Sequence, residues 1–201
     1  GAYGADLAYR TIHGDGQGAM KSLKAVESLS AQLEMTNAFD KALMERFKAH
    51  VDQEDSLLRL SGEAFQSADQ YLKANDRNDL SALILAGGWI ETLHLSVISA
   101  TSSQDKGLMD RIGSQGRALK DLVSLLEEGD KDGSCAALCA DLRDLGVVYQ
   151  GIATTYTYEE PVTTVKDKTT YINSRSTVEI DMEQVAAISD RVAVMRNKHF
   201  N

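Results

Sequence analysis

The feature that most constrains this chain is its lack of proline. The only proline among the 201 residues is Pro161, so the first 160 residues contain none. Average usage would give about ten in a chain of this length. Proline removes a backbone donor and clashes with the preceding turn inside a helix. We therefore expect long helices over most of the sequence.

Apolar residues recur at steps of three and four, which predicts helices that each bury one face. The clearest run is Leu138, Leu142, Leu145, Tyr149 and Ile152. Similar steps predict further helices, and the full set covers about residues 6–34, 37–51, 53–73, 79–102, 105–128 and 134–152, with a last helix after a capping box of Asp181 and Gln184.

The segment of residues 79–102 is apolar nearly all round. Such a helix lies either at the centre of a protein or across a membrane. Glu91 and His94 interrupt the apolar run and make it a poor membrane span. We expect the central helix of a bundle, in which Gly87 and Gly88 let a neighbouring backbone approach closely.

Composition changes after Ala153, where residues 154–177 hold eight threonines, three tyrosines and the only proline. β-Branched and aromatic residues favour strands, so we predict a hairpin of about residues 162–165 with 169–173. The fold class is therefore mainly all-α. It is a single domain over residues 1–201, an antiparallel bundle of about six to seven helices with an extended or hairpin insertion at 155–178 before the last helix.

The formal net charge of −9 disfavours binding to anionic partners. Nucleic-acid binding rests on Lys and Arg contacts to phosphates, and no basic run is present, so we expect no nucleic-acid partner. The same charge disfavours docking on an anionic membrane surface. Cys135 and Cys139 are too few for a disulfide framework. They lie at i and i+4 on a predicted helix, and we expect them to pack in the protein core.

The candidate ligand-pocket residues are Trp89, Glu91 and His94. Glu91 is the only charge between Asp79 and Asp105, and a buried carboxylate needs a partner or becomes neutral. One interpretation is a core pair, or a cap on a neighbouring helix end. The other is a ligand pocket beside Trp89, because residues at i and i+3 share a helix face.

The motifs that carry catalytic or metal chemistry are incomplete. Glu91-x-x-His94 matches half of a di-metal carboxylate site, which needs a second such pair and two further glutamates. The glycines of residues 14–18 resemble a phosphate nest but lack the Lys-Ser/Thr of a P-loop, so a helix break is expected there. Residues 130–133 resemble part of a calcium loop without its ligand register. We predict no catalytic residue, no metal ligand and no cofactor.

Three stretches resemble an uncharacterised family of small helical lipoproteins of Bacteroidetes. They are residues 4–9 (GADLAY), 83–91 (LILAGGWIE) and 172–180 (INSRSTVEI), which together span most of the chain. The resemblance implies a cell-envelope protein on the periplasmic side or in the outer membrane, with a lipid anchor on a cysteine upstream of Gly1. It implies no catalytic residue. We expect the chain to be a processed fragment whose targeting segment lay upstream.

Three functions follow as expectations. The first is a non-enzymatic cell-envelope protein that binds or scaffolds an unknown partner, which one contiguous apolar or threonine–tyrosine surface patch would favour. The second is a small-molecule-binding or sensory bundle with a pocket near Glu91. The third is a metal-dependent enzyme, which rests on the half motif alone.

Overall fold

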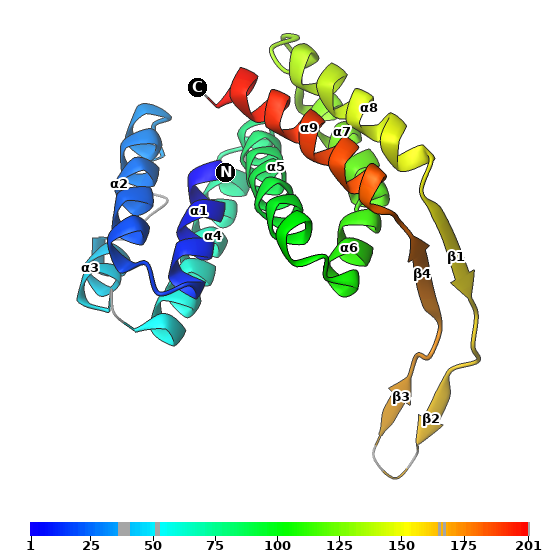
Figure 1. Ribbon diagram of the computed structural model, residues 1–201. Helices are drawn as coiled ribbons and strands as arrows, with labels where there is room; N and C mark the ends of the chain where they lie inside the picture. The colour runs from blue at the N-terminus through cyan, green and yellow to red at the C-terminus, as the bar shows by residue number, and fades with distance from the viewer. Residues whose placement is uncertain (36–40, 51–52, 165, 167, 201) are drawn as a thin grey trace.

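The computed structural model describes residues 1–35, 41–50, 53–164, 166 and 168–200. The chain is mainly α-helical, with short antiparallel strands before the last helix, as the sequence predicts (Figure 1). In chain order the elements are α1 (Ala2–Ile12), α2 (Gly16–Gln32), α3 (Lys41–Ala49), α4 (Glu54–Ala74), α5 (Asn78–Ser103), α6 (Lys106–Gly113), α7 (Gly116–Gly129), α8 (Ala136–Gln150), β1 (Ala153–Thr157), β2 (Val162–Thr164), β3 (Thr169–Tyr171), β4 (Arg175–Glu179) and α9 (Met182–His199).

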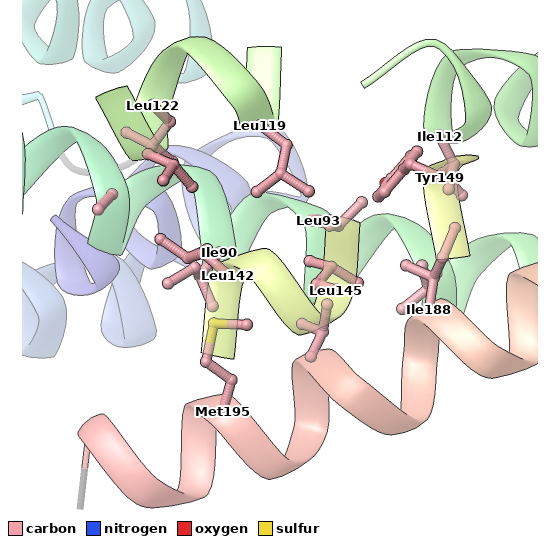
Figure 2. Close-up of a cluster of buried hydrophobic side chains, with 14 of the residues drawn as sticks. Ile90, Leu93, Ile112, Leu119, Leu122, Leu142, Leu145, Tyr149, Ile188 and Met195 are labelled. Atoms are coloured by element: carbon pink, nitrogen blue, oxygen red, sulfur yellow. The ribbon is translucent and has the colours of Figure 1, made fainter. Parts of the chain in front are cut away.

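The helices form two groups, each with its own hydrophobic core. Helices α1 to α4 enclose a cluster that includes Leu23, Phe47 and Leu60. Helices α5 to α9 enclose a larger one, in which Ile90, Leu142 and Ile188 are completely buried (Figure 2). The apolar steps predicted for residues 138–152 and for the last helix are the ones that face this larger core.

Helix α5 is the central helix, as predicted. It packs against α1 and α4 of the first group and against α6, α7 and α9 of the second. Its length and composition alone would suffice to cross a membrane, but a core helix passes the same test. Its inward side chains, such as Ala86, Ile90 and Val97, are fully buried, whereas Leu85 and Ile98 are exposed.

Gly87 and Gly88 allow a close helix contact, also as predicted. The backbone at the start of α1 crosses them: a Cβ built on Gly87 would lie 3.2 Å from the Ala2 amide nitrogen. A larger side chain on this face of α5 would push α1 away, because a well-packed contact tolerates little added volume. These two glycines therefore set the spacing between the two helix groups.

The expected break at residues 14–18 and the expected capping box are both present. Gly14 has a φ of +68°, which glycine adopts readily, and the Asp15 side chain accepts a hydrogen bond from the Gly18 amide at the start of α2 (2.8 Å). At α9, the Gln184 amide donates to Asp181 Oδ1 (2.8 Å) and the Asp181 amide donates to Gln184 Oε1 (3.1 Å). The predictions for residues 37–40, 51 and 165 lie outside the described residues.

The prediction of one helix over residues 105–128 is wrong, because α6 ends at Gly113 and α7 begins at Gly116. Close packing on both sides explains this corner. A Cβ on Gly113 would lie 2.6 Å from Val178 Cγ1 of β4, and a Cβ on Gly116 would lie 3.3 Å from the Tyr149 ring. Each glycine lets another element sit directly on the backbone. The apolar periodicity continues across the corner, so the sequence pattern does not indicate that the helix ends there.

The predicted hairpin is confirmed but is shorter than the ribbon that carries it. β2 pairs antiparallel with β3, with Val162 opposite Tyr171. A second pair was not predicted from the sequence: β1 and β4 run antiparallel with Ala153 opposite Glu179. The two pairs follow one another and project from the helices between α8 and α9 (Figure 1). We call residues 153–164 and 168–179 the β-arm.

Candidate functional site

Glu91 lies at the junction of α5 and α9. The residue is 1% exposed, and its Oε2 accepts a hydrogen bond from Arg196 Nε at 2.6 Å. Helix periodicity puts Arg196 there, since it follows the inward residues Val192 and Met195 of α9 and its long stem can reach across to α5. The ion pair joins the two helices and meets the need of a buried carboxylate for a partner.

Asp6 and His94 lie around this pair. Burial, and then repulsion from the Glu91 carboxylate, raise the pKa of Asp6 on α1, and the two carboxyl groups are within hydrogen-bonding reach. Burial, and then the charge of Arg196, lower the pKa of His94. His94 Nδ1 is buried and has no partner among the described residues. The group brings together α1, α5 and α9 around one guanidinium, which lies near two carboxyl groups.

Trp89 does not belong to this group. It lies two residues before Glu91, which turns it to the opposite side of α5. There its Nε1 donates to Gln115 Oε1 at 3.1 Å, and its ring packs against the larger core. The structure thus brings Glu91 and His94 together and places Trp89 elsewhere. Asp6 and Arg196 were not predicted from the sequence, because no short motif connects residues 85 or more positions apart.

A small apolar pocket lies among the first group of helices. It is lined mainly by side chains of α1, α2 and α4, including Leu7, Val26 and Phe65, and its volume is about 110 Å³. Pockets for drug-sized ligands usually occupy about 300–1,000 Å³, so this one fits only a very small apolar molecule. Trp89, Glu91 and His94 do not line it.

The two cysteines are free and buried in and beside the start of α8. Burial raises the pKa of both thiols, which disfavours the reactive thiolate. Among residues 1–35, 41–50, 53–164, 166 and 168–200, no group of three or more His, Cys, Asp or Glu side chains could hold a metal ion. The arrangement around Glu91 is therefore a closed set of ionic and hydrogen-bonding groups, and the described residues add no metal-binding cluster or reactive thiol to it.

The β-arm is the most unusual surface of the molecule. All residues of β1 and β3 are exposed, as are most of β2 and β4. Large side chains stand in solvent on it, among them Ile172 at 77% and Tyr158 at 68% exposure. The threonine and tyrosine content of this segment was visible in the sequence, but its projection from the body was not.

Comparison of the chain with protein-family models, with curated proteins and with solved structures finds no match.

Proposed function

We propose that this chain is a non-enzymatic protein of the cell envelope that binds a protein partner through the β-arm. The observation that carries the proposal is the exposure of Tyr156, Tyr158, Val162, Tyr171 and Ile172, each more than half exposed, on one projecting element. Soluble proteins rarely leave such apolar groups together in water unless something covers them. The location in the envelope rests on the resemblance alone.

The chemistry of the β-arm suits protein recognition. Tyrosine is enriched among the residues that dominate binding energy, because its ring gives a large contact area and its hydroxyl a polar handle. The outer edges of β1 and β4 pair with no other strand among the described residues, so their backbone groups can accept an additional strand. A free two-stranded ribbon is only marginally stable in water, and a partner would stabilise it.

The β-arm is nevertheless held in one geometry midway along its length. The Ser174 hydroxyl donates to the Glu159 carbonyl oxygen and accepts from the Glu159 amide, both at 3.0 Å. Arg175 also pairs with the Glu159 carboxylate at 2.7 Å. These contacts join the two strand pairs where Pro161 interrupts the ladder. A partly pre-ordered arm loses less conformational entropy on binding.

A small-molecule pocket near Glu91 has less support, because the Glu91 carboxylate is already paired with Arg196 in a closed site.

Differential capture tests the proposal. The bait is the full chain, immobilised and exposed to a detergent-solubilised envelope extract. The arm variant is Tyr158→Ser combined with Ile172→Ser. The control is Val194→Ser, which removes a side chain of 67% exposure from α9. We expect one protein retained by the wild type and the control and lost from the arm variant. Equal retention by all three baits would contradict the proposal. Helical circular dichroism should match in all three, since the replaced side chains are exposed.

A further inference from the structure

The α1–α4 helix group joins the rest of the molecule through one interface and one short turn. Among the described residues, its core contains side chains from residues 7–64, and the larger core contains side chains from residues 82–200. Helices α1 to α4 and helices α6 to α9 lie on opposite sides of α5 (Figure 1). The chain passes between the two groups once, through residues 75–77, where Asp76 has a φ of +54°. Residues at the ends of elements are the usual hinges of rigid-body motions, so this turn is placed to act as one.

The interface buries little apolar side chain where α1 meets α5. Backbone lies on backbone there, and a Cβ built on Gly88 would lie 3.7 Å from the Gly1 carbonyl oxygen. Helix α4 adds a small cluster that includes its Leu72 and Leu80 of α5. Hydrophobic stabilisation follows the apolar area that is buried, and glycine has no side chain to bury. The docking of the two groups therefore depends more strongly on the polar groups in the interface.

Asp6 and Glu91 meet across this interface, from α1 and α5. Glu91 is 1% exposed and pairs with Arg196 of α9 at 2.6 Å. The Asp6 carboxyl group lies within hydrogen-bonding reach of Glu91 and near Arg196. Two carboxylates this close repel one another when both are ionised, whereas one shared proton turns the contact into a hydrogen bond. The protonation of Asp6 therefore decides whether this contact holds α1 on α5 or pushes it away.

The pKa of Asp6 fixes the sign of the effect. Burial, and then repulsion from Glu91, raise this pKa. A raised pKa means that the docked state binds the proton more tightly than the separated state does. The contribution of Asp6 to docking is therefore present below its usual pKa of 3.8 and is lost as the pH rises through the folded-state pKa.

The other charged groups at this interface do not reproduce that sign. Arg10 of α1 and Arg196 of α9 favour the ionised form of Asp6, and Arg10 is already in an ion pair on the surface of its own group. No charge from α2 or α4, which also pack on α1, is among the described residues that shift the pKa of Asp6. Burial lowers the pKa of His94 and of the Gly1 amino group, so their protonation opposes docking as the pH falls. Opening that increases with rising pH therefore identifies Asp6.

We propose that Asp6 and Glu91 form a pH-sensitive latch between the two helix groups. While their carboxyl groups share a proton, α1 to α4 stay docked on α5. When the proton is lost, the first group swings away about the turn of residues 75–77, and each group keeps its own core. Opening exposes the face of α5 that α1 covers, including Gly87 and Gly88, so access to that face depends on pH. The latch is independent of the β-arm and of the function proposed for it.

Single-molecule fluorescence energy transfer across the two groups of the full chain tests the latch. The dyes are attached to Ser28→Cys on α2 and Ala140→Cys on α8, at exposed positions, while the two native thiols are buried. The measurement runs over the pH range in which helical circular dichroism is constant. We expect a high-transfer population in acid and a low-transfer population that grows as the pH rises, so that the ratio of docked to open molecules falls severalfold by pH 7.

Three variants assign the change to the latch. Asp6→Asn keeps a hydrogen-bond donor beside Glu91 without a titrating group, and should stay docked as the pH rises. Asp121→Asn removes a carboxylate whose side chain is 74% exposed on α7, and should behave as the wild type does. His94→Gln should keep the rise in opening. The proposal is overturned if the wild type shows one population at every pH, if Asp6→Asn opens as the wild type does, or if His94→Gln abolishes the rise.

Discussion

Removing Arg196 should destabilise the protein more than removing the charge of its partner. Arg196→Met keeps the apolar stem and deletes the cation, which leaves Glu91 buried and unpaired next to Asp6. Glu91→Gln deletes the anion and leaves a guanidinium whose side chain is 35% exposed. That guanidinium still reaches water and lies near Asp6. Both substitutions thus break the same ion pair, but Arg196→Met leaves a buried carboxylate and Glu91→Gln leaves a partly exposed guanidinium.

The burial of each partner sets the expected magnitudes. Breaking a buried ion pair from one side costs about 3–5 kcal/mol. Because Glu91 is 1% exposed, we expect Arg196→Met to lower the free energy of unfolding by about 3 kcal/mol. For Glu91→Gln we expect about 1–2 kcal/mol, since the remaining charge is partly hydrated. The double variant should cost less than the sum of the two, because contacting residues are coupled.

Urea denaturation at pH 7 measures these differences, followed by circular dichroism and by the fluorescence of Trp89, the single tryptophan. Repeating the series in acid adds a check, because protonation of Asp6, whose pKa is raised, removes a negative charge beside Glu91 in Arg196→Met. Its deficit should therefore shrink in acid. Equal losses below about 0.5 kcal/mol in both single variants would mean that the pair is solvated as surface pairs are, and the reasoning would be refuted.

Three other predictions concern single positions. Asp6→Asn should raise the melting temperature at pH 7, because the pKa of Asp6 is raised in the folded protein: the stability that its protonated form contributes is present below the usual pKa of 3.8 and is lost as the pH rises through the folded-state pKa. The melting temperatures of the two proteins should therefore converge below pH 3.8, and a difference independent of pH would contradict this. Gly113→Ala should cost about 1–3 kcal/mol, because the new Cβ would lie 2.6 Å from Val178 Cγ1; an unchanged urea midpoint would show that β4 shifts freely. Cys135 and Cys139 should react with a disulfide reagent at pH 8 no faster than the protein opens, because both thiols are buried and the pKa of each is raised. Labelling as fast as that of a free thiol would contradict the packing of α8.

The sequence predicts the helices well because burial follows helical periodicity. The steps Leu138, Leu142 and Leu145 and the capping box at Asp181 report local physics, and both are present as expected. The corner between α6 and α7 escaped prediction because its cause is tertiary: Gly113 and Gly116 receive β4 and α8, which lie more than 30 positions further on.

The candidate site was predicted in part for the same reason. Glu91 and His94 are one turn apart on α5, and that spacing puts them on one face. Asp6 and Arg196 join them only through the packing of α1 and α9 against α5, which no local pattern encodes. The pairing of β1 with β4 was missed in the same way, because it joins residues on either side of the hairpin.

Site-specific photo-crosslinking from the β-arm tests the central claim most directly. A photoreactive phenylalanine analogue would replace Ile172, at 77% exposure on the β-arm, or Val194, at 67% exposure on α9, as the matched control. Each protein would be irradiated in the envelope extract and separated by mass. If the β-arm binds a partner, Ile172 gives one discrete adduct that excess unlabelled wild-type chain competes away, and Val194 does not. The claim is contradicted if Ile172 gives no adduct, or if both positions give the same adducts.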